Sequence, residues 1–379
     1  MSALTDRLRE RIRRDGPITF HDWMKAALYD PEQGYYCRSD RKRWGREGDY
    51  RTSPERSVLF ASTFARYFAK LFLDLGSPRA WTIVEAGAGA GHFAEGVLET
   101  LERRFPPVFT ATTYCLDETS ADSRARAAQQ LARFGDKAQF RHLEELNRLD
   151  RAIIISNELL DAFPVHRLVM RENELAEFYV GVNGVGSFEW TIGKPSTKRL
   201  NEHFSQLGIR LEEGQKAEAN LSVADWFELA VGKIDEGFLI TLDYGAEARE
   251  LYDSHTRPEG TLRSFERHQF ASDVLQRPGE QDITSSIDWS FVKKVGANLG
   301  LEVVAFERQD RFLLNAGLIE EMELRTSEIE GEAERLSLRT NAREMILPGG
   351  LAGSFQVLVQ KKNKPRINAD DTDQTKTGY

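Results

Sequence analysis

Three closely spaced glycines stand out in the segment IVEAGAGAGHF, residues 83–93. Gly87, Gly89 and Gly91 follow an apolar run that predicts a strand and precede a run that predicts a helix. Glycine lets the backbone turn tightly and approach a ligand closely, and the amides at a helix N-terminus face that ligand. The spacing therefore predicts a cofactor-binding loop, and a tight turn without a ligand is the simpler alternative.

The pattern of this loop distinguishes between two classes of cofactor. A dinucleotide-binding loop has the spacing GxGxxG, whereas this loop reads GxGxG and has Glu85 two residues before its first glycine. A carboxylate at that position suits a ligand that carries an ammonium group or hydroxyls in place of phosphates. The loop therefore favours S-adenosylmethionine over NAD.

The next predicted strand ends in Asp117 and Glu118, about 30 residues after the loop. A carboxylate at the end of the second strand is well placed to bridge two ribose hydroxyls. We assign this role to Glu118 and keep Asp117 as the alternative. A solvated helix cap is the competing interpretation of either residue.

Polar residues also follow the buried strand RAIIIS, residues 151–156, in the segment NELLDAFPVH. If residues 157–162 begin a helical turn, Glu158 and Asp161 lie at positions i and i+3 on one face. Two convergent carboxylates match the donor fork of a guanidinium group, and dipole-compensating helix capping is the alternative. We predict that Asn157, Glu158 and Asp161 form the catalytic site for a cationic acceptor.

Strands and helices alternate around these motifs, which predicts βαβ units and an α/β, Rossmann-like core. The predicted core strands are residues 81–86, 111–117, 151–156, 237–243, 301–307 and 354–362. We divide the chain into an N-terminal helical extension with a substrate-side loop (1–75), a first core half (76–165), an insertion (166–235), a second core half with substrate loops (236–362) and a disordered tail (363–379). Thr19 is the expected N-cap of the second helix.

Composition excludes several classes of function. The formal net charge of −9 argues against a nucleic-acid partner, which favours a basic surface. The two cysteines, Cys37 and Cys115, form no CxxC pair, so we expect neither a multi-cysteine zinc site nor a disulfide framework. No apolar run reaches the roughly 18 residues that a membrane span needs, so we expect no membrane insertion. The two separated cysteines fit a reducing compartment, and we expect a cytoplasmic location and no metal.

The ordered set of motifs resembles the MidA-like methyltransferases, the family of the mitochondrial complex I assembly arginine methyltransferase. The resemblance covers about residues 16–310 and rests on GYYCRSDRKRWGREGDYRTSPERS, VEAGAGAGHF, SNELLDAFPVHR, LDYG, GTLRSFERHQ and PGEQDITSSIDWS. It implies a class I methyltransferase fold with a seven-stranded sheet, S-adenosylmethionine as methyl donor, and a protein arginine of a respiratory NADH dehydrogenase subunit as acceptor.

The resemblance also implies roles for particular residues. Gly87, Gly89 and Gly91 match the cofactor loop of the family, and Glu118 matches its ribose-binding acid. Its signature sites around cofactor and acceptor match Gly48, Asp49, Thr52, Ser53, Pro54, Glu55, Asn157, Glu158 and Asp161. The loop AGAGAG lacks the proline and arginine frequent in the family, while Tyr50 and Phe265 replace phenylalanine and tyrosine; these departures leave the acceptor open.

We expect direct in-line transfer of a methyl group, without a metal or covalent intermediate. The loop 31–56, which contains Gly48, Asp49 and Ser53, is predicted to be a lid or wall over cofactor and acceptor. His268 is a candidate general base, although a structural or surface histidine is the simpler interpretation. An NAD-dependent oxidoreductase, a non-catalytic assembly factor and a small-molecule methyltransferase are the alternatives, and a homodimer stays open.

Overall fold

The computed structural model describes residues 2–38, 58–266, 269–270, 273–347 and 354–364. The predicted site residues Gly48, Asp49 and Ser53 lie outside the described residues, as do His268 and most of the predicted tail, residues 365–379. Within the described part of the chain, no helix is long and apolar enough to cross a membrane.

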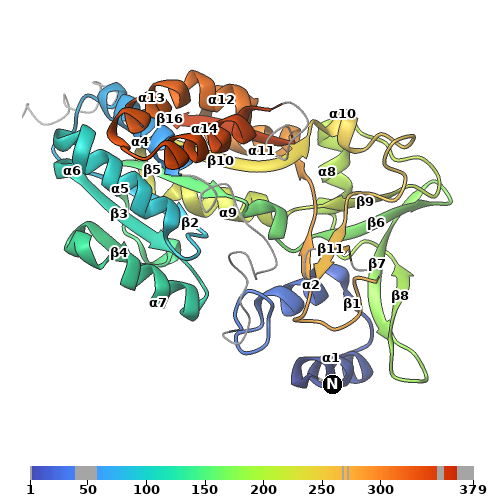
Figure 1. The fold of residues 1–379 in the computed structure, drawn as a ribbon. Helices are drawn as coiled ribbons and strands as arrows, with labels where there is room; N and C mark the ends of the chain where they lie inside the picture. The colour runs from blue at the N-terminus through green and yellow to red at the C-terminus, as the bar shows by residue number, and fades with distance from the viewer. Residues whose placement is uncertain (1, 39–57, 267–268, 271–272, 348–353, 365–379) are drawn as a thin grey trace, which may run out of the picture.

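A central sheet runs in the order β4–β3–β2–β5–β10–β16–β15, with the short β14 pairing beside β10 (Figure 1). Its strands are β2 (Trp81–Ala86), β3 (Thr112–Asp117), β4 (Ala138–Phe140), β5 (Leu149–Asn157), β10 (Ile234–Ala246), β14 (Ile287–Asp288), β15 (Leu301–Arg308) and β16 (Phe355–Lys362). Only β16 runs antiparallel to its neighbours in the seven-stranded path. The predicted seven-stranded, mostly parallel α/β sheet is therefore confirmed.

Helices cover both faces of this sheet, which explains why its central strands are apolar throughout. Successive β5 residues point to opposite faces: Ile153 and Ile155 pack with α4 (Val58–Asp74) and α5 (His92–Arg104), whereas Ala152 and Ile154 pack with the opposite layer. That opposite layer contains α9 (Ser222–Gly232) and α11 (Trp289–Asn298). Both core faces therefore meet along the strand whose end carries the predicted acceptor residues.

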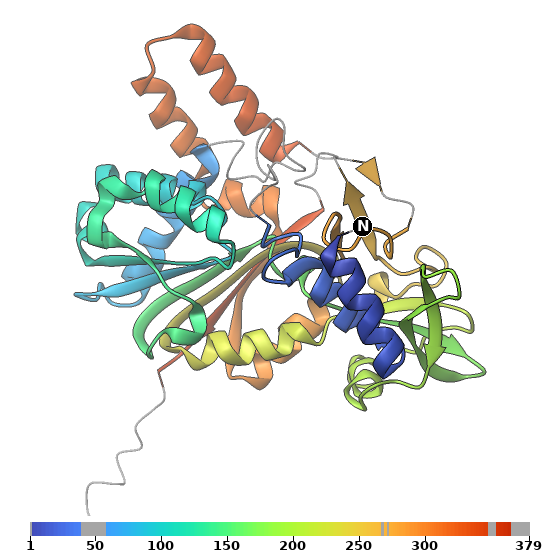
Figure 2. The ribbon, with the colours of Figure 1, turned by 90° about the horizontal axis from the view of Figure 1, so that it is seen from below.

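The insertion forms a second sheet in the order β1–β7–β6–β9, with β8 paired to β7. Its strands are β1 (Ile18–Thr19), β6 (His166–Arg171), β7 (Glu174–Val182), β8 (Phe188–Gly193) and β9 (Lys216–Ala219). Because β1 comes from the N-terminal extension, the extension and the insertion share one sheet and one apolar cluster. Figure 2 shows the blue N-terminal helices beside the green strands of the insertion. The Thr19 hydroxyl accepts a bond from Asp22 N, which confirms the expected N-cap of α2 (Phe20–Tyr29).

The described chain also contains further helices and 3-10 turns. They are α1 (Ala3–Asp15), α6 (Pro106–Ala111), α7 (Ala121–Gln130), α8 (Arg199–Leu207), α10 (Ala248–Leu251), α12 (Gln309–Asn315), α13 (Leu318–Glu328), α14 (Glu332–Ile346), and the 3-10 turns η1 (Ala132–Lys137), η2 (Leu143–Glu145) and η3 (Leu160–Ala162). A small third sheet contains β11 (Arg263–Glu266), β12 (Gln269–Phe270) and β13 (Asp282–Thr284). The pair α13–α14 projects from the core in Figure 2, away from the N-terminal extension.

Candidate active site

The glycine loop joins β2 to α5 through three residues in the left-handed region. The φ angles of Gly87, Gly89 and Gly91 are 71°, 54° and 81°, a conformation that other residues rarely adopt. A Cβ on Gly87 would lie 3.0 Å from Leu159 Cδ1, and one on Gly91 would lie 2.9 Å from Ala127 Cβ. An added Cβ at Gly87 or Gly91 would crowd these neighbours, so glycine lets the loop turn tightly and leaves its backbone bare for a ligand.

The carboxylate of Glu118 closes the edge of this cradle. Gly89 N–H donates to Glu118 Oε2 over 2.7 Å, and Ser120 N–H donates to Glu118 Oε1 over 2.7 Å. The Asp117 side chain instead contacts His142 Nδ1 at 3.0 Å, and burial raises the pKa of Asp117. Of the two acids considered for the ribose, Glu118 is therefore the one that lies against the glycine loop.

Glu85 lies behind the loop, within the buried layer of the sheet. Its side chain is 8% exposed and accepts a 2.8 Å hydrogen bond from the Tyr114 hydroxyl. Burial raises the pKa of Glu85 to about 8, so this carboxyl takes up a proton near neutral pH. Glu85 thus supports the strand beneath the loop, and its direct contact with a cofactor stays a prediction.

The predicted helical turn after β5 is wrong. Glu158 has a φ of 51°, in the left-handed region, and the only helical turn there, η3, begins at Leu160. The Glu158 amide donates to Leu242 O over 2.9 Å, so backbone pairing with β10 continues past the end of β5. Glu158 and Asp161 therefore do not share a helix face; the Glu158 carboxylate accepts from Asn157 Nδ2 over 3.3 Å.

Asp243, at the end of β10, is the residue that the sequence did not single out. Its Oδ2 accepts from Leu160 N over 3.0 Å and from Asp161 N over 3.2 Å, and its Oδ1 accepts from Tyr244 N over 2.9 Å. The side chain is fully buried. Asp243 therefore holds η3 in place. The motif LDYG, residues 242–245, contains Asp243 and was the signal in the sequence that could have identified it.

Asp161 is a buried carboxylate with one oxygen that accepts no hydrogen bond from the described residues. It is 6% exposed, the Tyr244 hydroxyl bonds to it, and its Oδ1 has no hydrogen-bond partner among the described residues. Burial raises the pKa of Asp161 to about 6, and burial together with repulsion from Asp161 raises the pKa of Asp243. Within the described chain, no lysine, arginine or histidine forms an ion pair with either carboxylate, so the pair suits a cationic ligand.

The N-terminal extension reaches this site through two tyrosines. The Tyr29 hydroxyl donates to Ala162 O over 3.0 Å, and the Tyr36 hydroxyl donates to Asp282 Oδ1 over 2.6 Å. Their ring centroids are 5.5 Å apart. The structure therefore places the extension and β13 beside η3.

A protein family described as "Putative S-adenosyl-L-methionine-dependent methyltransferase" matches residues 63–307, which is more than half of the chain. The chain belongs to this methyltransferase family.

The methyltransferase also resembles two crystal structures of COG1565 superfamily proteins from Burkholderia thailandensis. One, bound to S-adenosyl-homocysteine, has 26% identity and a TM-score of 0.83, over 95% of this chain and 92% of that chain. The other has 28% identity and a TM-score of 0.80, over 95% and 91%.

Two curated relatives are animal proteins. The methyltransferase is 26% identical, over 79% of its length and 71% of the relative, to "Protein arginine methyltransferase NDUFAF7 homolog, mitochondrial" of Drosophila melanogaster. It is 24% identical, over 81% of its length and 72% of the relative, to "Protein arginine methyltransferase NDUFAF7, mitochondrial" of Mus musculus. The predicted family, fold and cofactor class are confirmed: the chain is an S-adenosylmethionine-dependent methyltransferase.

The residues of the glycine cradle fit this cofactor. Gly87, Gly89 and Gly91 adopt left-handed φ angles and carry no side chain that would cover the backbone of the loop. Glu118 offers a carboxylate to hydroxyls, and the loop leads directly into the N-terminus of α5. When bound, S-adenosylmethionine supplies a methyl group on a positively charged sulfur. The turn η3 borders the same cradle, since Leu159 is the residue against Gly87.

Proposed function

We propose that this methyltransferase modifies an arginine side chain of a protein. The observation that carries the proposal is the open carboxylate of Asp161, buried beside Asp243 without a basic partner among the described residues. A guanidinium group supplies both the positive charge and the donors that such a site needs. The names of the fly and mouse relatives support the same acceptor.

The chemistry requires a site that holds charge and accepts a proton. An arginine nitrogen forms a bond to the methyl carbon as the bond from that carbon to sulfur breaks, and the nitrogen then loses one proton. Asp161 Oδ1 is available for a hydrogen bond to the guanidinium and for that proton, and its pKa of about 6 suits uptake and release near neutral pH. Asp243 fixes the position of Asp161 through the backbone, which limits motion between the reacting groups.

We also propose which protein carries the methylated arginine and where the enzyme acts. A subunit of the respiratory NADH dehydrogenase is the acceptor that the family resemblance suggests. A cytoplasmic location is consistent with Cys37 and Cys115 not being joined in a disulfide. Asn157 and Glu158 are proposed to line the acceptor side of the cradle, next to each other at the end of β5.

The identity of the methylated residue tests this function. The purified enzyme is incubated with S-adenosylmethionine labelled in its methyl group and a cell extract depleted of small molecules, and the labelled protein is hydrolysed. Label recovered as methylarginine supports the proposal. Label recovered in lysine or histidine, or only in small molecules added back to the extract, contradicts it.

A further inference from the structure

Every backbone carbonyl of η3 accepts a hydrogen bond from a segment that lies outside the strands of the central sheet. These bonds run from Asn220 Nδ2 to Leu160 O (2.9 Å), from Ser285 N to Asp161 O (2.9 Å) and from the Tyr29 hydroxyl to Ala162 O (3.0 Å). The three donors belong to the insertion, to the segment after β13 and to the N-terminal extension. The core strand β10 holds the amides of the same turn through Asp243. The acceptor turn is therefore the point where these parts of the chain meet.

Tyr29 is the last residue of α2, so the packing of that helix fixes its position. Trp23 of the same helix is fully buried in the apolar cluster that the extension shares with the insertion. Burial, together with the negative charge of Asp161, raises the pKa of Tyr29 well above its usual value. The hydroxyl therefore keeps its proton and is the donor to Ala162 O.

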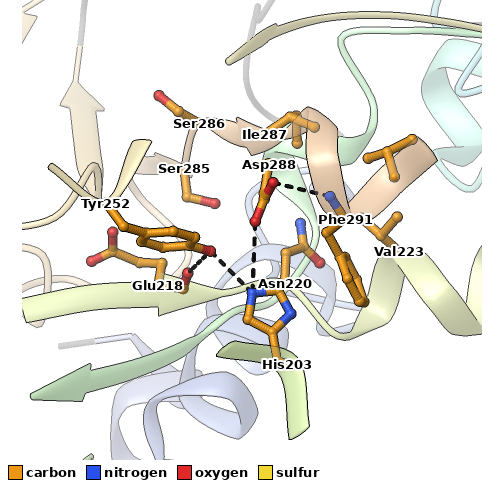
Figure 3. A pocket seen from close by; sticks show the side chains of 11 residues that line it. His203, Glu218, Asn220, Val223, Tyr252, Ser285, Ser286, Ile287, Asp288 and Phe291 are labelled. Atoms are coloured by element: carbon orange, nitrogen blue, oxygen red, sulfur yellow. Dashed lines mark hydrogen bonds and ion pairs between the residues drawn. The ribbon is translucent and has the colours of Figure 1, made fainter. Parts of the chain in front are cut away.

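Asn220 lies in the insertion, between β9 and α9. Its side chain lines the same small polar pocket as Ser285, which Figure 3 shows. Two residues further along, Ser222 Oγ donates to Pro164 O over 3.1 Å. The start of α9 thus binds the segment 160–164 at both of its ends.

These backbone contacts set the position of the Asp161 carboxylate. Asp161 Oδ1 has no hydrogen-bond partner among the described residues, so its place depends on the backbone that carries it. The turn η3 is only three residues long, and both its amides and its carbonyls are bound from outside. A displacement of about 1 Å between reacting groups can slow a reaction by about 100-fold. A shift of the extension or of the insertion therefore reaches the acceptor carboxylate.

We propose that Tyr29 and Asn220 are positioning residues for methyl transfer, which hold the backbone of η3 so that Asp161 meets the acceptor. The proposal rests on the proposed contact between Asp161 and the acceptor. Both side chains bind the backbone of the turn and not the Asp161 carboxylate, so they act through η3. The extension and the insertion thus set the geometry of a site whose carboxylate comes from the core.

The variant Tyr29→Phe removes the hydroxyl and keeps the ring. The rate of label transfer from S-adenosylmethionine to the proteins of a cell extract should fall by about tenfold at saturating cofactor, while cofactor affinity stays within about twofold of the wild type. Tyr179→Phe is the matched control, because the Tyr179 hydroxyl also donates to a backbone carbonyl, Lys194 O, over 2.8 Å, but within the insertion. An unchanged rate in Tyr29→Phe, or an equal fall in Tyr179→Phe, would overturn the proposal.

Asn220→Ala tests the same role from the side of the insertion. The variant removes the donor to Leu160 O and should also slow transfer by about tenfold without a loss of cofactor affinity. Asn315→Ala is its control, since Asn315 Nδ2 donates to Glu307 Oε2 on the far part of the chain, over 2.7 Å. A wild-type rate in Asn220→Ala would remove Asn220 from the proposal.

Hydrogen exchange of the peptide that covers residues 157–165 gives a readout without an acceptor. The buried amides of Leu160 and Asp161 should exchange faster in Tyr29→Phe than in the wild type, because the turn opens more often. Tyr179→Phe should leave this exchange unchanged. Wild-type protection in Tyr29→Phe would contradict the hold on η3.

The double variant Tyr29→Phe, Asp161→Asn tests whether Tyr29 acts through Asp161. If it does, Tyr29→Phe should slow the wild type but should not slow Asp161→Asn further. An equal further slowing in the Asp161→Asn background would overturn the proposal. A slow Asp161→Asn beside a wild-type rate in Tyr29→Phe would refute the positioning role alone, whereas a wild-type rate in Asp161→Asn would refute the acceptor contact on which it rests.

Discussion

The carboxylate of Asp243 holds the backbone amide of Asp161, with 3.2 Å between Asp243 Oδ2 and Asp161 N. The two residues come from different strands' ends, yet this contact and the adjacent bond to Leu160 N define the turn η3. Both carboxylate oxygens of Asp243 accept hydrogen bonds from backbone amides. Asp161 Oδ1 has no hydrogen-bond partner among the described residues and is available to a ligand. One acid is therefore a positioning residue and the other a candidate ligand contact.

Replacing Asp243 by asparagine should loosen η3. The variant keeps one acceptor oxygen and turns an NH₂ group toward a backbone N–H that Asp243 accepts from, so the free energy of unfolding should fall by about 1–3 kcal/mol. Methyl transfer should fall by about tenfold or more, with kcat affected and S-adenosylmethionine affinity nearly unchanged. Denaturant unfolding and calorimetric titration measure the two effects, and an unchanged kcat in a folded variant would refute the positioning role.

Gly91→Ala should weaken both the fold and cofactor binding. Alanine at this φ of 81° is strained, and its Cβ would lie 2.9 Å from Ala127 Cβ. Gly208→Ala is the matched control, because Gly208 has a φ of 66° but no atom within 4 Å of the added Cβ. We expect a loss of about 1–2 kcal/mol for the control and a larger loss for Gly91→Ala. Equal losses of stability, with cofactor affinity retained in both, would argue against a tight cradle.

Glu118→Gln should lower the affinity for S-adenosylmethionine by about tenfold, because a hydrogen bond to a charged carboxylate is lost. Asp117→Asn is the comparison, since the Asp117 side chain contacts His142 instead of the glycine loop. Calorimetric titration of both variants decides between them. A larger loss for Asp117→Asn would reverse the assignment of the ribose-binding acid.

Much of this fold was predictable because buried strands and amphipathic helices leave periodic patterns in the sequence. The strand ends and the glycine loop followed from such local signals. The role of Asp243 did not, since its contact with Leu160 joins residues that are 83 positions apart. The helix predicted at residues 157–162 failed for the same reason: the pairing of Glu158 N with Leu242 O outweighs the local preference for a helical turn.

Glu158 has a strained backbone conformation and also a proposed role beside the acceptor. Two substitutions separate the effect on stability from the effect on activity. Glu158→Gly should raise the free energy of unfolding by about 1 kcal/mol, because glycine adopts a φ of 51° without strain. Glu172→Gly, at an exposed turn with a φ of 56°, should stabilise by a similar amount. Only Glu158→Gly should also reduce methyl transfer. If both variants retain full activity, the proposed acceptor-side role of Glu158 is wrong.

The stability of the enzyme should depend on pH through Asp161. Its pKa rises from 3.8 to about 6 because of burial, so the folded state holds the proton more tightly than the unfolded state. Protonated Asp161 stabilises the folded state at low pH, and this stabilisation is lost as the pH rises from about 4 to about 6. The free energy of unfolding should fall by about 1–3 kcal/mol over this interval. The difference in unfolding free energy between wild type and Asp161→Asn, measured across this interval, should show that slope. A pH-independent difference would mean that Asp161 titrates normally.

The most direct test of the central claim is single-turnover methyl transfer by Asp161→Asn, with cofactor affinity measured on the same preparation. The exposed Asp150→Asn is the control. If Asp161 holds the cationic acceptor, its variant should transfer methyl groups at least about 100-fold more slowly while binding S-adenosylmethionine within about twofold of the wild type. Transfer at the wild-type rate by Asp161→Asn would contradict the assignment of this carboxylate to the acceptor.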